Sequence, residues 1–278
     1  MATVSAKNID RRDQAVLPLR KILFPIDFSD QCKGAARYVE ALTGRFNAAL
    51  TLLTVADPQY NSPLSDSDVQ RRRELQSFWV DELKYFQVDR VFAKGDPASE
   101  IVSCAHRGRF DLIMMPTHGL NGFRRLWIGS VTSKVLHHAD CPVWTGMHLE
   151  LAPPLENITF KHFLCAVDMT PYSEKVIQSA LELADEYSAS LTVIHIQPCI
   201  AGADENKQKI KAWLGGSKRD VSILVGTGEV ARLTAIAAAR EQADLLVIGR
   251  NPVAGIFGRL RSKAYSIIQQ SPCPVMSI

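Results

Sequence analysis

Short apolar runs alternate along the chain with segments in which apolar side chains recur every three or four residues. Residues 22–26 (ILFPI) form the first run, and the segment 32–46 that follows has the spacing of an amphipathic helix. Apolar strands separated by helices indicate right-handed crossovers and a parallel sheet with helices on both of its faces. The pattern therefore predicts an α/β protein.

The expected elements are as follows. In the first part of the chain, strands are predicted at 22–26, 50–55, 88–93, 111–115 and 141–144, and helices at 32–46, 68–86, 98–107 and from 129 onward. In the second part, helices are predicted at 173–187, 207–214, 230–241 and 262–270.

The second part repeats the first. The matching segments are 21–27 (KILFPID) with 162–168 (HFLCAVD), 49–55 with 190–196, 110–113 with 243–246, and 141–143 with 273–275. A repeat of this length decides the architecture and indicates two tandem domains. We expect a loose extension at 1–18, a first domain at 19–148, a linker at 149–157 that contains Pro153-Pro154, and a second domain at 158–278.

Composition and charge restrict the kinds of protein to which the chain can belong. The 278 residues suffice for two domains, and the 46% hydrophobic and 22% charged residues are typical of a globular protein. A net charge of +3 gives no argument for a nucleic-acid partner, and no apolar run is long enough to span a bilayer. Six cysteines without a CxxC pair indicate reduced thiols, so a cytoplasmic protein without a metal site is expected.

One segment has the features of an anion site. Residues 117–119 follow the strand 111–115, at the strand end where open α/β sheets bind ligands. Gly129, Ser130 and Thr132 stand at the start of a helix, where unpaired N–H groups favour an anion, most commonly phosphate. The segment therefore predicts a phosphate-bearing small molecule as ligand.

The same segment resembles the nucleotide loop of the universal stress protein family, G-x-x-G-x9-G-[ST]. Gly119, Gly129 and Ser130 are in register with that pattern, whereas Pro116 replaces its first glycine. The resemblance extends from about Lys21 to Ile278. It implies two tandem domains of the adenine nucleotide alpha hydrolase-like fold, each with an open five-stranded parallel sheet, helices on both faces, and the first and fourth strands side by side.

The resemblance also implies a ligand and its contacts. The first domain is expected to bind ATP, with or without Mg²⁺, in a non-enzymatic stress-response or regulatory role. Asp27 would contact the nucleoside, and the backbone near Val55 would meet adenine. The expected nucleotide-binding residues are Asp27, Val55, Met115, His118, Gly119, Gly129, Ser130, Val131 and Thr132.

Three points weigh on this interpretation. Asp27 has an alternative role as the N-cap of the first helix, for which Ser29 and Asp30 would serve equally. Pro116 lacks an N–H group and has a fixed φ, so it can neither donate to a ligand nor take a positive φ. In the second domain Gly129-Ser130 becomes Arg261-Ser262 while Asp168 is retained, which predicts that this domain does not bind ATP in the family manner.

Two other functions stay open. In the first, neither domain binds ATP, and the chain is an interaction scaffold whose final strands, 142–145 and 274–278, form an internal pseudo-dimer, with a further homodimer as an addition. In the second, the GxGxxA segment 226–231 binds a dinucleotide for an oxidoreductase. That segment follows the third strand of its domain instead of the first, so a tight turn is favoured.

The chain contains no GxxxxGK[ST], GxSxG or HExxH pattern. No catalytic residue is predicted for this reason, and slow hydrolysis of bound ATP stays an open alternative.

Overall fold

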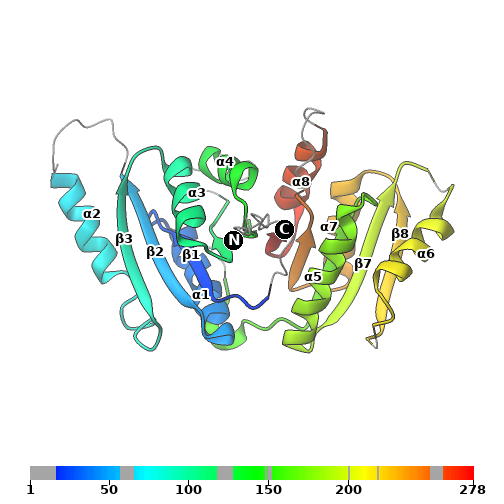
Figure 1. Cartoon of the computed structure of the whole chain (residues 1–278), viewed down its shortest axis with the longest axis horizontal. Helices are drawn as coiled ribbons and strands as arrows, with labels where there is room; N and C mark the ends of the chain where they lie inside the picture. Colours follow the sequence, from blue (N-terminus) through cyan, green and yellow to red (C-terminus); the bar gives the residue numbers. More distant parts are fainter. Residues whose placement is uncertain are drawn as a thin grey trace, which may run out of the picture.

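The computed structural model describes residues 17–56, 66–117, 128–147, 149, 152–199, 201–217, 219–250 and 259–278. They form two α/β halves that share one ten-stranded sheet with the strand order β3-β2-β1-β4-β5-β10-β9-β6-β7-β8 (Figure 1). The predicted α/β class and the tandem arrangement are confirmed.

The elements lie close to the predicted positions. The first half consists of β1 (Lys21–Pro25), α1 (Asp30–Phe46), β2 (Ala49–Ala56), α2 (Asp66–Ser77), β3 (Val88–Lys94), α3 (Pro97–Gly108), β4 (Leu112–Met114), α4 (Ser130–His138) and β5 (Val143–Thr145). The second half consists of β6 (His162–Val167), α5 (Tyr172–Tyr187), β7 (Ser190–Gln197), α6 (Ala203–Trp213), β8 (Val221–Thr227), α7 (Val230–Arg240), β9 (Leu245–Ile248), α8 (Arg259–Gln270) and β10 (Val275–Ser277). Among the described residues, no helix combines the length and the apolar character that crossing a membrane requires.

Within each half the strands are parallel, and the strand order reverses at the first strand. β1 lies between β2 and β4, with Leu23 opposite both Thr51 and Ile113. β6 lies in the same way between β7 and β9. The expected contact between first and fourth strands is therefore present in both halves, and it creates the edge at which open α/β sheets bind ligands.

The two halves join through their last strands, β5 and β10, which pair antiparallel. Met276 lies opposite Trp144, Ser277 lies opposite Val143, and the Ser277 hydroxyl donates to the Val143 carbonyl at 3.1 Å. The side chains of β5 and β10 are buried. The pairing makes one continuous sheet out of two parallel ones.

Each face of this sheet has its own hydrophobic core, and each core extends through both halves. Ile22 and Phe24 of β1 point to the face covered by α1, α2, α5 and α6, whereas Leu23 points to the face covered by α3, α4, α7 and α8. A strand buried on both faces needs apolar residues at successive positions, which explains the continuous apolar runs of the sequence.

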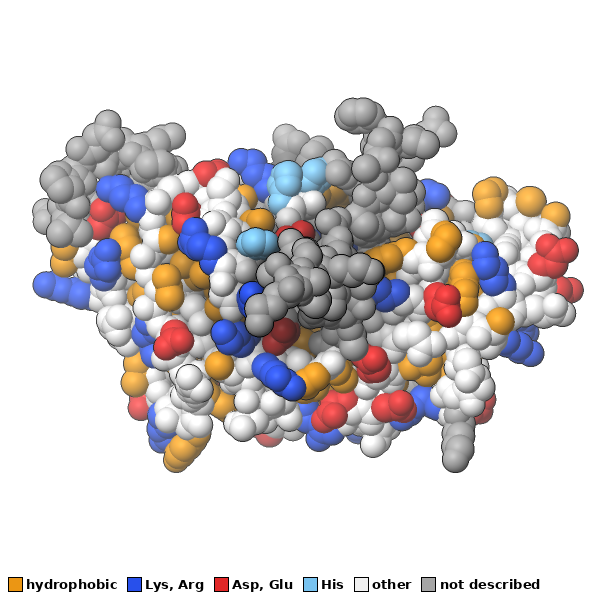
Figure 2. Space-filling model, in the orientation of Figure 1, with side chains coloured by type: hydrophobic (Ala, Val, Ile, Leu, Met, Phe, Trp, Pro, Cys, Tyr) orange, Lys and Arg blue, Asp and Glu red, His pale blue; other side chains and the backbone are white. Residues whose placement is uncertain are grey.

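Charged side chains are mixed on the surface. On the face drawn in Figure 2, basic and acidic side chains of the described residues lie interspersed instead of forming one basic field. This distribution agrees with the small net charge, and the absence of a nucleic-acid partner stays a prediction.

The helix predicted at 68–86 is too long. α2 ends at Ser77, and Trp79 has a left-handed backbone with φ of 52°. Phe78 is buried in the core, and the guanidinium of Arg90 donates to the carbonyls of Leu75 and Phe78, both at 3.0 Å. The prediction was wrong at its C-terminal end because this tertiary contact takes the carbonyls of the last helical turn.

Arg250, just after β9, binds the end of a helix in the other half. Its Nη1 donates to the carbonyls of Leu136 at 2.9 Å and Ala139 at 3.1 Å, and its Nη2 donates to that of Cys141 at 2.5 Å. Burial lowers the pKa of this guanidinium. The hydroxyl of Tyr265 adds a bond to the Ser133 carbonyl at 2.9 Å. The second half thus satisfies carbonyls at the C-terminal end of α4, which otherwise have no intrahelical partner.

Replacing Arg250 by Met tests this contact between the halves. Arg250→Met keeps an apolar stem but leaves three carbonyls without their donor, so we expect the free energy of unfolding to fall by about 2 kcal/mol. Arg240→Met, at an exposed position on α7, is the control and should change it by less than about 0.5 kcal/mol. Equal stability of the two variants in chemical denaturation would contradict the assigned role.

Candidate functional site

Several predicted site residues lie at the carboxyl-terminal edge of the first half. Asp27 and Val55 are both two residues beyond the paired residues Pro25 and Leu53 of β1 and β2. Met115 follows β4, and its N–H donates to the Trp144 carbonyl at 3.0 Å. The predicted residues His118 and Gly119 lie outside the described residues.

Asp27 supports the turn that leads into α1. Its Oδ1 accepts from the N–H of Ser29 at 3.1 Å and from the Ser29 hydroxyl at 2.6 Å. The Ser29 Oγ in turn accepts from the Cys32 N–H at 3.2 Å, so Ser29 is the N-cap of the helix. The alternative in which Asp27 only caps the helix is therefore wrong.

A strained residue follows the aspartate in both halves. Phe28 after Asp27 and Met169 after Asp168 both have φ of 65°. A left-handed backbone is unfavourable for such side chains, and residues of this kind cluster at functional sites. Because the left-handed residue recurs after Asp27 and after Asp168, the two copies share the same turn conformation.

The start of α4 is attached to the chain after β4. The Gly129 N–H donates to the Thr117 carbonyl at 2.8 Å, and the Thr132 hydroxyl donates to the Pro116 carbonyl at 3.0 Å. Pro116 itself is buried. The Thr132 hydroxyl is thus already hydrogen-bonded within the protein. The backbone N–H of Thr132 is the group of this residue that can donate to a ligand.

The first turn of α4 has amides available for an anion. Gly129 is the N-cap and makes no side-chain capping bond. The N–H groups of Ser130, Val131 and Thr132 have no protein acceptor among the described residues. Three such amides at the positive end of a helix, on the same sheet edge as Asp27, can hold a phosphate or a carboxylate.

The second half lacks this arrangement. α8 begins at Arg259, three residues before the counterpart of Ser130, so the amides of Lys263 and Ala264 lie inside the helix. Amides in the second helical turn bond to carbonyls four residues earlier and are not open to a ligand. This difference supports the prediction that the second domain does not bind ATP in the family manner.

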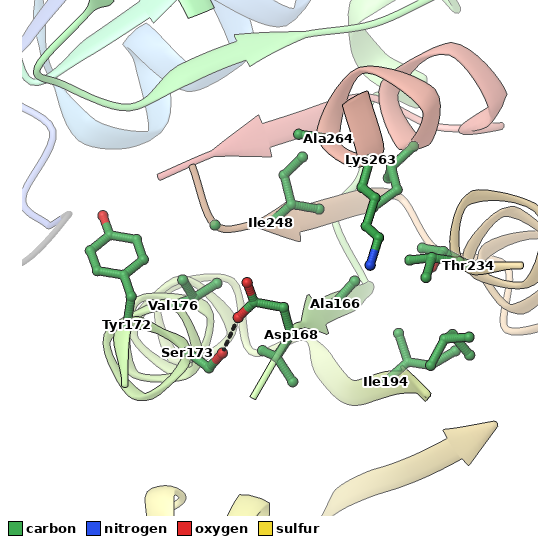
Figure 3. Close-up of a pocket in the computed structure, with 15 residues that line it drawn as sticks. Ala166, Asp168, Tyr172, Ser173, Val176, Ile194, Thr234, Ile248, Lys263 and Ala264 are labelled. Atoms are coloured by element: carbon green, nitrogen blue, oxygen red, sulfur yellow. Dashed lines mark hydrogen bonds between the residues drawn. The ribbon is translucent and has the colours of Figure 1, made fainter. Parts of the chain in front are cut away.

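The second half has a different pocket at the corresponding edge, between α5, α7 and α8 (Figure 3). It has a cavity volume of about 70 Å³, and its polar lining includes Asp168, Thr234 and Lys263. Sequence reasoning identified Asp168 and missed the other two. The repeat contains the signal, because Lys263 replaces Val131 and Thr234 replaces Ile101 of the first copy.

The GxGxxA segment forms a capped turn. The carboxylate of Glu229 accepts from the N–H groups of Ala231 at 3.0 Å and Arg232 at 2.7 Å, at the start of α7. Gly228 has φ of 144°, as a tight turn requires. A dinucleotide pyrophosphate would need the amides that Glu229 occupies, which argues against a cofactor here.

Comparison with known proteins assigns the family. The model of the universal stress protein family matches residues 18–145, 159–213 and 200–278. The chain is 30% identical over 135 residues to a universal stress protein of Methanocaldococcus jannaschii, an alignment that covers 45% of this chain and 79% of that protein. The chain belongs to the universal stress protein family.

Two solved structures share the fold along nearly the whole chain. A universal stress protein from Archaeoglobus fulgidus has a TM-score of 0.76 at 19% identity, covering 92% of this chain and 97% of that one. A protein of unknown function from Pseudomonas aeruginosa has a TM-score of 0.66 at 18% identity, covering 95% and 93%. At these identities the likeness shows the fold, and it agrees with the two-part architecture.

The thiol next to the site is predicted to be inert. Cys32 lies in the first turn of α1, and burial, with a smaller contribution from the charge of Asp27, raises its pKa to about 12. Near pH 8, close to the ordinary thiol pKa of about 8.5, Cys32 should therefore remain protonated and unreactive to iodoacetamide. Cys199 is exposed and should be alkylated first. Peptide mass spectrometry measures both, and equal rates in the folded protein would contradict the assigned burial.

Proposed function

We propose that the first half binds an adenine nucleotide, with ATP as the expected ligand, and that occupancy serves a non-enzymatic stress-response or regulatory role. The observation that carries the proposal is the set of open amides at the start of α4, on the same sheet edge as Asp27. An anion site alone would fit many ligands. The nucleotide is favoured because the segment 115–132 resembles the nucleotide loop of the family to which the chain belongs.

Each part of the site would contact a different part of the ligand. The N–H groups of Ser130, Val131 and Thr132 would donate to phosphate oxygens, which favour a helix N-terminus. The half-buried Asp27 carboxylate would accept from ribose hydroxyls, and the backbone at Val55 would border the adenine. Met115, Gly129 and the loop residues His118 and Gly119 complete the proposed set. Mg²⁺ would enter bound to the triphosphate and its waters.

The joint between the halves supports a second part of the proposal. We infer that the antiparallel pairing of β5 with β10 makes the chain an internal pseudo-dimer, since the last strand of each half pairs with the last strand of the other half. A further homodimer would have to use other surfaces. All six cysteines are free thiols, which supports the reducing cytoplasm expected for this protein.

Comparing the two repeated aspartates tests nucleotide binding. ATP at a hundredfold excess over its dissociation constant should raise the free energy of unfolding by about 2.7 kcal/mol. Asp27→Asn should reduce this gain, and Asp168→Asn, the matched change in the second half, should leave it intact. The free energy of unfolding of each variant is measured by chemical denaturation with and without ATP. The gain is the difference between the two values, so a change in basal stability does not affect the comparison.

Two outcomes would reject nucleotide binding by the first half. One is a folded wild-type protein that gains no stability at millimolar ATP. The other is an equal loss of the gain in Asp27→Asn and Asp168→Asn. Mass spectrometry of small molecules released from protein purified without added nucleotide identifies the ligand, and phosphate release measures any slow hydrolysis.

Replacing Pro116 by Gly distinguishes the nucleotide-binding protein from the interaction scaffold. Glycine restores an N–H group and a free φ at the first position of the loop pattern. If proline limits binding, Pro116→Gly should lower the dissociation constant for ATP by about tenfold, equivalent to one hydrogen bond of about 1.4 kcal/mol. Isothermal titration checks this, and absence of ATP binding in both proteins would favour the scaffold.

A further inference from the structure

The pocket of the second half contains a positive and a negative group that are not paired with each other. Lys263 on α8 forms no hydrogen bond or ion pair with any described residue, and its ammonium group points into the pocket (Figure 3). Among the described residues, Asp168 is bonded through Oδ1 alone, which accepts from the Thr170 N–H at 3.1 Å and from the hydroxyls of Thr170 at 2.7 Å and Ser173 at 2.9 Å. Its second oxygen is turned away from Ser173.

A buried hydroxyl on the same pocket lacks a partner. Thr234 of α7 is fully buried, and its Oγ1 makes no hydrogen bond among the described residues. A buried polar group left unsatisfied costs about 1–3 kcal/mol. Figure 3 shows Thr234 on the side of Lys263 opposite to Asp168. An acceptor brought by a ligand near Lys263 would satisfy both donors.

The rest of the pocket is apolar. Val176 of α5, Ile194 of β7 and Ile248 at the end of β9 are buried and line it. Such a surface favours an aliphatic body, with the polar groups of the pocket fixing its orientation. The ligand therefore needs an anionic end, a hydrogen-bond donor and an aliphatic part.

The size of the cavity excludes an enclosed nucleotide. A buried water needs about 10–15 Å³ of such volume, so the cavity of about 70 Å³ holds about five to seven heavy atoms. A nucleoside triphosphate is several times larger. The two polar groups that distinguish this pocket, Lys263 and Thr234, replace apolar residues of the first half, so the two halves differ in the chemistry of this region.

We propose that this pocket binds a small aliphatic carboxylate that also has an amino or hydroxyl donor, such as a short amino acid or a 2-hydroxy acid. The carboxylate accepts from Lys263 and Thr234, and the donor binds the second oxygen of Asp168. The aliphatic part lies on Val176, Ile194 and Ile248. The site is separate from the proposed nucleotide site and does not depend on it.

Binding to the full-length protein by isothermal titration tests the proposal with four probes. L-2-aminobutanoate and 2-hydroxybutanoate have both polar ends and differ only in the donor. Butanoate lacks the donor, and propylamine lacks the carboxylate. At least one of the first two should bind saturably, and each truncated probe should bind about tenfold more weakly, as expected for loss of one charged hydrogen bond. Which of the first two binds identifies the donor.

Variants distinguish this pocket from other surfaces. Lys263→Met should weaken binding of the better probe by at least about tenfold, and Thr234→Val, which keeps the shape, by about threefold. Lys207→Met on α6 removes another exposed lysine and should leave binding unchanged. Circular dichroism confirms that each variant is folded.

Three results would overturn the proposal. These are no saturable binding of either bifunctional probe, binding that is unaffected by both Lys263→Met and Thr234→Val, or displacement of the probe by ATP. The last result would mean that the pocket is a nucleotide site. Failure here leaves the ATP measurements on Asp27→Asn untouched, because those concern the other half.

Discussion

The antiparallel pairing of β5 with β10 is the contact on which the architecture depends. Two parallel sheets, whose last strands would each have one unpaired edge, become one sheet whose two cores both extend across the joint. Because the pairing is antiparallel, the strands of the two halves run in opposite directions where they meet. Their carboxyl-terminal edges, and with them the two candidate sites, consequently lie at opposite edges of the sheet, so each half can hold a ligand without obstructing the other.

The sequence was sufficient for the architecture, whereas the residues of the first site stay a prediction. Apolar runs and the internal repeat predicted the class of fold. The strand order implied by the family resemblance placed Asp27 and the loop after the fourth strand at one sheet edge, where β1 and β4 are indeed neighbours. The sequence could not decide whether Asp27 or Ser29 caps α1, because aspartate and serine are both common N-cap residues. The structure shows that Ser29 binds the Cys32 amide and that Asp27 binds Ser29. The sequence-based prediction also extended α2 too far, since the burial of Phe78 and the contact with Arg90 depend on the tertiary structure.

The divergence of the second copy was only partly visible in the sequence. Arg261 in place of Gly129 indicated a lost phosphate contact, whereas the earlier start of α8, which draws the equivalent amides into the helix, is a conformational change that no single residue reveals. Lys263 and Thr234 belong to different helices, so their common pocket became evident only when α7 and α8 were placed side by side. The repeat aligned the residues, and the fold placed them on one pocket.

The guanidinium of Arg250 limits how the protein can be divided. α4 offers its N-terminal amides to the candidate nucleotide site of the first half, yet carbonyls at its other end are held by a residue of the second half. A fragment that stopped in the linker would expose the edge of β5 around Trp144 and remove that cation from the tail of α4. Such a fragment would tend to aggregate through the exposed edge of β5, and its α4 would lose order at the C-terminal end. Ligand binding at the native site should therefore be measured on the intact chain.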